Sequence, residues 1–208
     1  MKVAVIGGSG AMGMGIARHL SKNYQVIIGS RDPSRAVAAA SEMGGASGAD
    51  YKGASREADI VIFSIPYEAM GLVGDLAGEV SSKLVISAIN PMKLEEGLFR
   101  YALEGGSAAE ELARILPHSR VATAFNNVPA RFLKDDVVPP VDILIATDSK
   151  ETYEEAAGLV ASVKEMRPLY AGPLTEARTV EEITPLVLNL ASLNGTKALT
   201  TRFVTRRG

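Results

Sequence analysis

The sequence predicts an α/β protein with a doubly wound, mostly parallel sheet and a small C-terminal α/β extension that ends in a long helix. Three observations support this fold class. Short β-rich runs alternate with longer helical patterns almost to the C-terminus. Several of the β-rich runs are continuously apolar, as expected when helices cover both faces of a sheet. A glycine-rich loop follows the first run, which is typical of a Rossmann-type fold.

The expected elements follow one another in a regular order. The predicted strands cover residues 2–6, 25–29, 59–65, 84–88, 120–125, 141–146 and 168–171. The predicted helices, with apolar residues three and four positions apart, cover residues 12–21, 33–43, 68–80, 107–116, 152–164 and 179–194. Residues 44–53 are small and glycine-rich, which predicts a loop or an irregular short strand. We expect a first domain over residues 1–147 and a C-terminal extension over residues 148–208.

Two helix starts carry local signals. Asp32 precedes Pro33, which places a capping oxygen before a proline at the first helical position. Thr179 and Glu182 have the spacing of a capping box, which predicts that the last helix begins near Thr179 and contains Pro185. The arginines near the C-terminus are expected to be solvated; they are Arg202, Arg206 and Arg207.

The composition excludes several classes of function. The chain has 208 residues, of which 47% are hydrophobic and 22% charged, as in ordinary globular proteins. The net charge of −2 lacks the basic excess of nucleic-acid-binding proteins, so we expect no nucleic-acid partner. No apolar run is long enough to span a membrane, and the first strand is too short to be the core of a signal peptide. We therefore expect a cytoplasmic protein with no membrane partner.

The chain is poor in side chains that do reactive chemistry. It has no cysteine and only two histidines, His19 and His118, which excludes thiolate chemistry and cysteine-ligated metals. We therefore expect no metal site and no catalytic side chain. Any chemistry should come from a bound cofactor.

The loop after the first strand has the spacing of a dinucleotide-binding fingerprint. It reads as Gly8-x-Gly10-x-x-Gly13, or as Gly7-x-x-Gly10-x-x-Gly13 with one additional residue. Glycine permits the tight turn and the close approach of a pyrophosphate to the N–H groups at the start of a helix. A plain glycine turn is the alternative, but the position between a strand and a helix favours a dinucleotide site.

The residues at the end of the second strand indicate whether NAD or NADP is bound. An enzyme that uses NAD usually has Asp or Glu there, to bind the ribose 2′-OH. This chain has Ser30 and Arg31, with Arg35 one helical turn later. A hydroxyl and guanidinium groups bind a 2′-phosphate, which a carboxylate would repel, so we predict NADP(H). For Arg35 a surface position is the alternative.

Polar groups also follow three other predicted strands. They are Ser64-Ile65-Pro66, Ile89-Asn90-Pro91-Met92 and Asn126-Asn127-Val128-Pro129-Ala130. Ligands bind at the carboxyl ends of the strands in open α/β sheets. Although each stretch is also a plausible strand-to-loop transition, their repetition at one sheet edge predicts a shared cleft.

A distinctive block lies in the C-terminal third. It runs from Ala171-Gly-Pro-Leu-Thr-Glu-Ala-Arg178 through Glu182-Ile-Thr-Pro-Leu-Val-Leu-Asn189 to Asn194-Gly195. Together with the glycine loop, Gly29-Ser30-Arg31 and Ile65-Pro66, this block resembles the NADPH-dependent coenzyme F420 reductases, also called F420:NADP oxidoreductases. The resemblance covers nearly the whole chain. The glycine loop is common to many dehydrogenases, so the C-terminal block carries the assignment.

The resemblance implies a reaction that the composition permits. Members of the family pass a hydride reversibly between C5 of the deazaflavin and C4 of the nicotinamide, with the two rings stacked in one cleft. Because the hydride moves directly between two cofactors, no acid–base side chain is strictly required. The first 147 residues would bind NADP, and the extension would complete the F420 pocket.

The match also implies roles for individual residues. Ser9, Gly10, Ala11 and Met12 would bind the pyrophosphate, and Ser30, Arg31 and Arg35 the 2′-phosphate. Ile65, Pro66, Asn126, Val128 and Ala130 would lie along the nicotinamide. Ile89, Asn90, Pro91 and Leu199 would face the deazaflavin, although Leu199 is also suited to simple packing.

Asn126 departs from the family pattern. Members often have a histidine at this position, whereas Phe125-Asn126 is similar to related ferric-reductase domains that reduce a flavin. An NADPH-dependent flavin or ferric reductase is therefore an alternative, as is an imine reductase of the pyrroline-5-carboxylate type. Imine reduction usually needs a proton donor, and no Lys or His stands out in the expected cleft. A non-catalytic NADP(H)-binding module is disfavoured by the C-terminal block.

The apolar pattern of the last helix predicts an interface between two subunits. It is apolar at Ile183, Leu186, Val187, Leu190 and Leu193, and a helix so broadly apolar must be buried on more than one side. The face is widened by Val180, Leu188 and Ala191. The resemblance implies that C-terminal helices pack across a homodimer, whereas packing within one subunit is the alternative.

Overall fold

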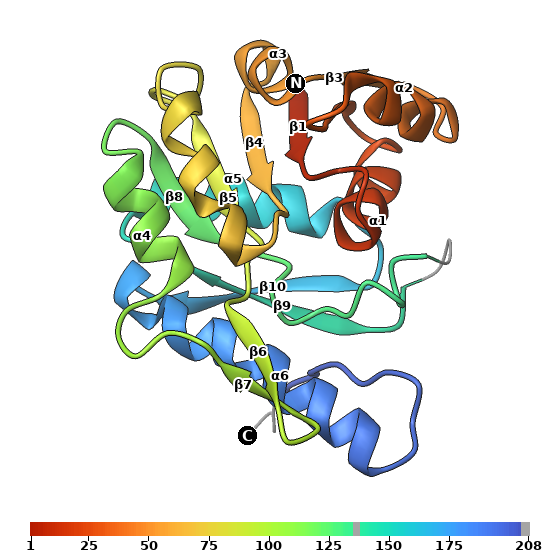
Figure 1. Ribbon diagram of the computed structural model, residues 1–208, viewed down its shortest axis with the longest axis vertical. Coiled ribbons are helices and arrows are strands. Elements are labelled where there is room, and N and C mark those ends of the chain that lie inside the picture. The colour runs from red at the N-terminus through yellow and green to blue at the C-terminus, as the bar shows by residue number, and fades with distance from the viewer. Residues whose placement is uncertain (135–137, 205–208) are drawn as a thin grey trace.

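A six-stranded parallel sheet forms the centre of the molecule (Figure 1). The computed structural model describes residues 1–134 and 138–204. The strand order is β3-β2-β1-β4-β5-β8. The strands are β1 (Lys2–Ile6), β2 (Gln25–Gly29), β3 (Ala46–Ala49), β4 (Ile60–Phe63), β5 (Leu84–Ser87) and β8 (Arg120–Thr123). The predicted doubly wound fold class is confirmed.

Helices cover both faces of this sheet, which explains the uninterrupted apolar strands. Val3 and Val5 of β1 belong to one core with residues of the helices α1 (Ala11–Leu20), α2 (Pro33–Ser41) and α5 (Lys150–Ala161). Ala4 and Ile6 belong to the other core, with residues of α3 (Tyr51–Glu57) and α4 (Ala108–Ile115). Successive side chains of a strand point to opposite faces, so both sets must be apolar.

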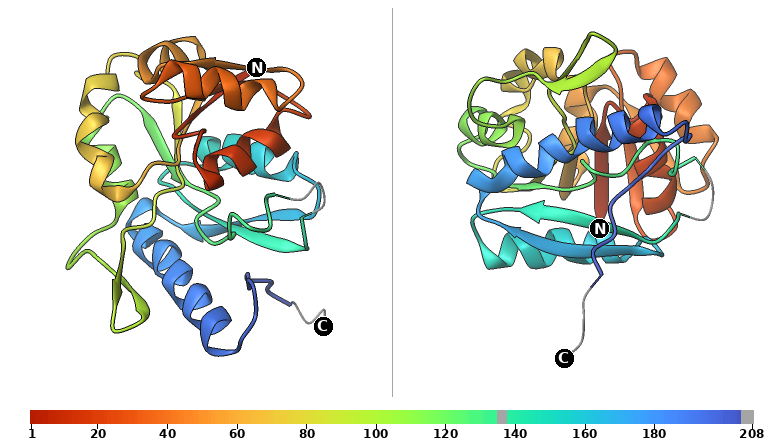
Figure 2. Two further views of the ribbon diagram at one scale, coloured as in Figure 1. Left: turned by 45° about the vertical axis from the view of Figure 1, so that its right-hand side comes forward. Right: turned by 90° about the horizontal axis from the view of Figure 1, so that it is seen from below.

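The strand order reverses between β1 and β4, because β2 and β3 lie on one side of β1 and β4, β5 and β8 on the other. The loops that follow β1 and β4 therefore diverge and leave a crevice at the carboxyl ends of the strands. This is the usual ligand position in open α/β sheets. The helix α6 (Ala177–Leu193) and the hairpin β6 (Met92–Glu95) and β7 (Leu98–Tyr101) lie beyond this edge (Figures 1 and 2).

A second, two-stranded parallel sheet joins β9 (Val141–Ala146) to β10 (Met166–Gly172), and α5 connects them. Thr123 at the end of β8 links the two sheets, because its hydroxyl accepts a hydrogen bond from the Ala146 N–H at 2.8 Å. α6 follows β10 through the short 3₁₀ turn η3 (Leu174–Glu176).

Two sequence predictions about the stretch from 44 to 80 need correction. The helix expected over 68–80 consists of the 3₁₀ turns η1 (Tyr67–Leu72) and η2 (Gly74–Leu76); Gly71, Gly74 and Gly78 disfavour a regular α-helix there. The stretch 44–53 does contain the short strand β3, but it also contains the start of α3, whose first turn is capped by Asp50 through the Gly53 N–H at 2.6 Å. Ser107, Ser149 and Asp32 cap their helices in the same way.

The hairpin and the start of α6 were also misjudged. Glu96 and Gly97 connect β6 to β7 with φ values of 49° and 80°, which is a two-residue turn that lacks the usual Asn-Gly or Asp-Gly signal. α6 begins at Ala177 without a side-chain cap, so the capping box predicted at Thr179 is absent and Pro185 lies inside the helix, as expected. None of the helices in the described residues is long and apolar enough to cross a membrane.

Candidate active site

The glycine loop is shaped by backbone contacts that leave no room for side chains. Gly7 has φ +86°, and a Cβ there would clash with the Ser64 carbonyl. A Cβ on Gly13 would lie 2.6 Å from the Gly7 carbonyl oxygen, and one on Gly8 would lie 2.8 Å from the Val5 oxygen. At Gly10 the nearest atom would be 3.3 Å away. The steric requirement therefore falls on Gly7, Gly8 and Gly13, which close the turn against α1.

The start of α1 faces the crevice at the strand ends. Gly10 is its N-cap residue, and no side chain in the described residues caps the helix. Gly10, Ala11 and Met12 line the cleft instead. Free N–H groups at a helix start attract an anion, so this turn is suited to a pyrophosphate.

A polar hollow of about 530 Å³ lies beside the glycine loop. Its lining includes the three residues expected at the 2′-phosphate, Ser30, Arg31 and Arg35, together with Ser9, which was expected at the pyrophosphate. The Ser9 and Ser30 hydroxyl oxygens lie 3.3 Å apart, so the structure joins two positions that are 21 residues apart in sequence. Arg31 forms no ion pair within the described part of the chain, which leaves its guanidinium available to a ligand.

Asp32 also lines this hollow, where its carboxylate serves as the cap of α2. Its carboxylate accepts hydrogen bonds from the Ser34 hydroxyl at 2.6 Å and from the Ser34 N–H at 2.9 Å, and so caps α2. These hydrogen bonds lower the pKa of Asp32. The carboxylate is thus held at the helix, as the sequence predicted.

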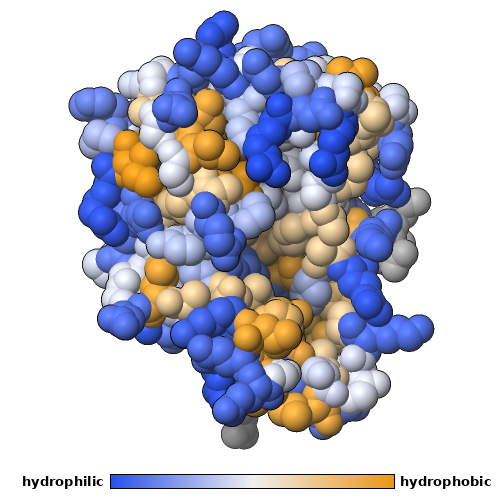
Figure 3. All heavy atoms as spheres, viewed as in Figure 1, coloured by the Kyte–Doolittle hydropathy of each residue, from blue (hydrophilic) through white to orange (hydrophobic). Residues whose placement is uncertain are grey.

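The main cleft, of about 670 Å³, opens from the same loops (Figure 3). It shares Gly10, Ser64, Ile65 and Pro66 with the polar hollow, so the two form one continuous site. Ten residues expected from the sequence line it: Gly10, Ala11, Met12, Ile65, Pro66, Asn90, Asn126, Val128, Ala130 and Leu199. The strand-end polar groups are therefore brought together as predicted.

Ile89 and Pro91 are the exceptions. Ile89 is 1% exposed and packs into the core shared by β4, β5 and α4, and Pro91 is also buried. Ala88, Asn90 and Met92 line the cleft in their place. In extended chain alternate side chains face opposite ways, so a stretch that presents Asn90 to the cleft must turn its two neighbours away.

Asn126 is held rigidly at the floor of the cleft. Phe125 adopts φ +66°, an uncommon conformation for a large residue, and this bend ends the run of extended chain after β8. The Asn126 side-chain amide donates to the Ile89 carbonyl at 3.1 Å and to Asn90 Oδ1 at 3.3 Å, and the Thr184 hydroxyl donates to the Asn126 carbonyl at 2.6 Å. Asn126 is thereby fixed from two other segments.

One acceptor at this position has no partner in the described structure. Asn126 Oδ1 is buried and accepts no hydrogen bond from the described residues. A buried polar atom normally has a partner, so this oxygen is suited to a ligand that donates an N–H. The carboxamide of a nicotinamide is such a group.

The opposite wall comes from the hairpin and α6, and of its residues only Met92 belongs to a stretch that the sequence placed at the cleft. The wall residues are Met92 and Phe99 of the hairpin and Thr184, Leu188, Ala191 and Ser192 of α6. Asn189 binds the hairpin to α6, because its amide accepts from the Phe99 N–H at 2.8 Å and donates to the Phe99 carbonyl at 2.9 Å. A single asparagine within a broadly apolar helix was the sequence signal for this contact.

Glu181 strengthens the same wall. It is fully buried, accepts a hydrogen bond from the Tyr101 hydroxyl at 2.7 Å, and caps α4 through the N–H groups of Ala108 and Ala109 at 3.0 and 3.1 Å. Burial raises the pKa of Glu181 to about 7, against the opposing effect of these hydrogen bonds. Three segments therefore meet at one carboxyl group.

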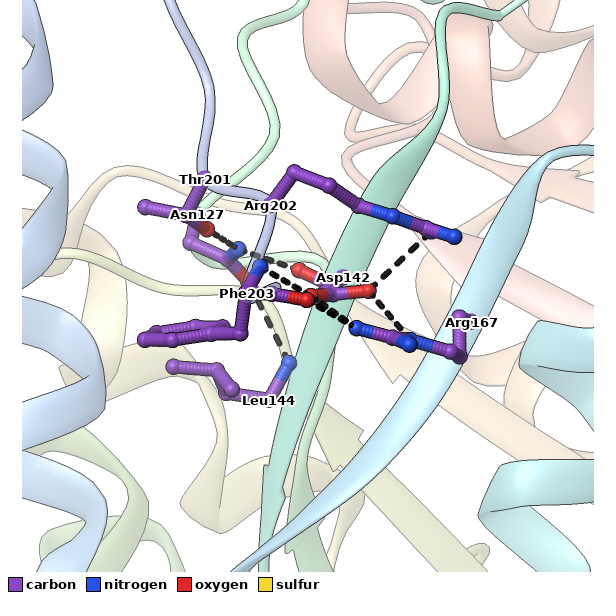
Figure 4. Close-up of polar contacts among 7 residues, drawn as sticks. All are labelled: Asn127, Asp142, Leu144, Arg167, Thr201, Arg202 and Phe203. Carbon is purple, nitrogen blue, oxygen red and sulfur yellow. Dashed lines mark hydrogen bonds and ion pairs between the residues drawn. The ribbon is translucent and has the colours of Figure 1, made fainter. Parts of the chain in front are cut away.

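The segment after α6 is fastened across β9 (Figure 4). Asp142, which is fully buried, accepts two hydrogen bonds from Arg167 at 2.7 and 2.8 Å, one from Arg202 at 3.1 Å and one from the Phe203 N–H at 2.6 Å. Asn127 donates to the Asp142 carbonyl and to the Thr201 hydroxyl at 2.6 and 2.7 Å. We call these contacts the C-terminal clasp.

The clasp fixes residues whose contacts could not be predicted from the sequence. Burial alone would raise the pKa of Asp142, but the hydrogen bonds from Arg167 and the Phe203 N–H outweigh it and hold this pKa below its usual value. Arg202, expected to be solvated, is an ion-pair partner instead, while Arg206 and Arg207 lie outside the described residues. The clasp positions Leu199 at the cleft.

The cleft offers little acid–base chemistry. Its described lining contains no Asp, Glu, His or Tyr, and its only ionisable side chains are Arg131 and Lys197. In the described residues no group of His, Asp and Glu is arranged to hold a metal ion. The arrangement suits the positioning of flat rings beside an anion site.

Comparison with known proteins identifies the family of the chain. Residues 2–91 match the family model described as NADP oxidoreductase, coenzyme F420-dependent. The F420-dependent NADP reductase of Methanothermobacter marburgensis is 38% identical, over 91% of this chain and 92% of that protein. The protein of the same name from Methanothermobacter thermautotrophicus is 40% identical, over 91% and 89%. The chain belongs to the family of F420-dependent NADP reductases.

The family predicted from the sequence is thus confirmed, and a solved structure shows the same fold. The crystal structure of a candidate F420-dependent NADP reductase from Arthrobacter sp. FB24 has a TM-score of 0.85 and covers 99% of this chain and 100% of that chain. The identity is 22%, so this comparison concerns the fold alone.

Proposed function

We propose that the cleft holds the nicotinamide of NADP(H) and the deazaflavin ring of coenzyme F420 together, so that hydride passes directly between them. Membership in the F420-dependent NADP reductase family makes this protein an oxidoreductase with NADP(H) and F420 as its redox partners. The observation that carries the mechanism is one continuous site with a cationic hollow at one end and no described carboxylate, histidine or tyrosine in the main cleft.

The chain supplies binding, orientation and exclusion of water. When bound, the nicotinamide supplies or accepts hydride at C4, and the deazaflavin at C5. The glycine loop and the start of α1 bind the pyrophosphate, while Ser30, Arg31 and Arg35 bind the 2′-phosphate through charge-assisted hydrogen bonds. Asn126 Oδ1 accepts from the carboxamide and thereby orients the nicotinamide. Such positioning alone accounts for a large part of a rate enhancement.

Apolar residues hold the two rings from opposite walls. Ile65, Pro66, Val128 and Ala130 pack along the nicotinamide. Leu188 of α6 and Leu199 of the following segment pack against the deazaflavin, with Asn90 at its edge. On this view residues 1–147 bind the nucleotide, and residues 148–208 complete the second pocket. Family members often have a histidine at position 126. Asn126 in its place is compatible with binding of both rings, because its unpartnered Oδ1 is a hydrogen-bond acceptor.

A spectral assay tests the function. Mixing the protein with NADPH and oxidised F420 should bleach the visible absorbance of the deazaflavin. FMN, FAD and a small cyclic imine, each offered in place of F420, serve as comparison substrates. Absence of bleaching under conditions where NADPH binds would overturn the proposal, and turnover of a flavin or imine but not of F420 would replace it with one of those activities.

We further propose a homodimer through α6. Leu186, Leu190 and Leu193 lie three and four positions apart and are 56%, 41% and 71% exposed, while Leu94 of the hairpin is 64% exposed. These residues do not line the cleft, which is bounded by the other side of α6. A second copy would cover this apolar surface. The proposal includes a cytoplasmic location, where both soluble coenzymes would be encountered.

The oligomeric state can be measured by sedimentation. The wild-type protein should sediment as a dimer, and the double variant Leu186→Glu/Leu193→Glu as a monomer. Val37, 56% exposed on α2, offers a control: Val37→Glu should leave the dimer unchanged. A monomeric wild type, at concentrations well above those of the assay, would contradict this proposal.

A further inference from the structure

Two cations lie in the main cleft without any assigned role. Arg131 follows Ala130 in the turn after β8, and Lys197 follows α6. Both line the same cleft. The hairpin residues Met92 and Phe99 line another part of the wall.

Neither cation has a charged partner within the described residues. Within the described residues, Arg131 and Lys197 form no ion pair and no side-chain hydrogen bond, whereas Arg167 and Arg202 are paired with Asp142. No Asp or Glu is present among the described residues of the cleft lining. Within the described residues, the cleft lining therefore carries two positive charges and no carboxylate.

The backbone on either side of each cation is fixed. Leu133, two positions after Arg131, is fully buried and packs so closely on α1 that a side chain at Gly15 would clash with it. The Thr196 N–H donates to the Ala191 carbonyl at 2.9 Å, just before Lys197, and the C-terminal clasp begins a few residues after it. The cations thus project from anchored segments into a defined cleft.

The phosphates of NADP already have partners elsewhere. The pyrophosphate is assigned to the start of α1, and the 2′-phosphate to the hollow lined by Ser30, Arg31 and Arg35. The second substrate is also an anion, because the side chain of F420 carries a phosphate and glutamate carboxylates beyond the ring. A largely apolar cleft whose lining includes two cations is complementary to a flat ring with an anionic side chain.

We propose that Arg131 and Lys197 bind the anionic side chain of the deazaflavin substrate and so distinguish F420 from deazaflavins that lack it. This inference rests on the proposed function, because it assigns a further part of the same substrate. Arg131 would bind a phosphate or carboxylate in a bidentate manner, and Lys197 would act as a point charge. Both residues are exposed, so their contribution should decrease as salt is added.

The test compares two substrates that share one ring. F420 is measured against the deazaflavin alcohol, which has the same ring and ribityl chain but no phosphate and no glutamates. The wild type should reduce both and should have a lower KM for F420. Arg131→Glu and Lys197→Glu should each raise the KM for F420 about fivefold and leave the KM for the alcohol unchanged. Fluorescence titration with F420 alone should give the same shift in Kd.

Lys150→Glu provides a matched control. Lys150 is on α5, its side chain is 82% exposed, and the substitution changes the net charge by the same amount. It should leave both KM values unchanged. Retained circular dichroism and melting temperature show that the cleft variants are folded.

The remaining outcomes overturn the inference. Equal effects on F420 and on the alcohol would place the cations at the ring, and a raised KM for NADPH would assign them to the nucleotide phosphates. No effect on any substrate would leave them as surface charges. Failure of the proposed function looks different, because the wild type would then reduce neither deazaflavin.

Discussion

The side of the cleft that we propose for NADP and the side that we propose for the deazaflavin are built in different ways. The first consists of consecutive residues at the ends of β1, β2 and β4, where each turn follows directly from its strand. The second joins the hairpin, α6 and the segment after α6, through contacts such as Asn189 to Phe99 and Asn127 to Thr201 that link positions 90 and 74 residues apart. A substitution on the first side should therefore affect mainly its neighbours in sequence. A substitution on the second side should also affect the hairpin, α6 or the segment after α6.

The largest effect is expected at the glycine loop. Gly13→Ala would place a Cβ 2.6 Å from the Gly7 oxygen and 2.7 Å from the Gly8 Cα, and the backbone must move. A displacement of this size at a phosphate site should weaken NADPH binding by on the order of a hundredfold or more, measured by titration calorimetry. Gly158→Ala in α5, where nothing lies within 4 Å of the new Cβ, should leave binding unchanged. Similar affinities for both variants would refute the steric argument.

The next effect concerns Glu181 in the opposite wall. Because the pKa of Glu181 is raised from 4.5 to about 7, the folded state holds this proton more tightly than the unfolded state. Its favourable contribution is complete below pH 4.5 and is lost as the pH rises through 7. Relative to Glu181→Gln, the wild type should lose about 3 kcal/mol of unfolding free energy between pH 4.5 and 8.

Urea denaturation of both proteins across this pH range measures the difference. Glu151→Gln, at an exposed position of α5, is the control and should follow the wild type. A pH-independent difference between the wild type and Glu181→Gln would show that the carboxyl group titrates normally in the folded protein.

Arg31→Asp should weaken the binding of NADPH much more than the binding of NADH. Loss of a charge-assisted contact and the new repulsion should weaken NADPH binding by about 2 to 3 kcal/mol. NADH binding should change little, because NADH has no 2′-phosphate. Kd values for both nucleotides, measured by fluorescence, test this expectation. Equal losses would mean that Arg31 does not bind the 2′-phosphate, and a change in the KM for F420 would mean that the two sides of the cleft are coupled.

The smallest effect is expected from Asp142→Asn in the C-terminal clasp. The amide keeps the shape but weakens the bonds to Arg167, Arg202 and the Phe203 N–H, at a cost of about 1 to 2 kcal/mol in unfolding free energy. The pKa of Asp142 is lowered from 3.8, so its contribution is complete above that value and is lost as the pH falls through the lowered pKa. The difference between variant and wild type should therefore vanish in acid.

Steady-state kinetics complete this comparison. Asp142→Asn should raise the KM for F420 while the KM for NADPH stays constant, since the clasp positions Leu199, which we propose to contact the deazaflavin. A rise in the KM for NADPH alone would contradict the division of the cleft into two sides.

The parts of the site that sequence could predict are those encoded by neighbouring residues. Ser30 and Arg31 follow β2 directly, and Asp32 caps the next helix within two positions, so local rules identified all three. Asn126 and Ile65 were found because they lie a few residues after β8 and β4. Ile89 and Pro91 were placed wrongly, since a tripeptide at a strand end does not reveal which of its side chains alternate towards the ligand.

The rest depends on long-range packing. Thr184, Leu188 and Phe99 face the cleft only because α6 and the hairpin lie beyond the strand ends, which no local pattern specifies. The hairpin itself was missed because its turn uses Glu96-Gly97 rather than a residue pair typical of such turns. The fold class was predictable because it depends on the alternation of strand and helix patterns along the whole chain. An error in one element does not change that overall pattern.

The C-terminal clasp also bears on how the second substrate enters and leaves. The segment that carries Lys197 and Leu199 is tied down mainly by side chains around one carboxylate and one amide, and it is not a strand of either sheet. Units with few buried apolar contacts open at lower free energy than core strands. The segment can thus detach while β9 stays paired with β10 and the glycine loop keeps its shape. Such an arrangement favours exchange of the deazaflavin while the nucleotide remains bound.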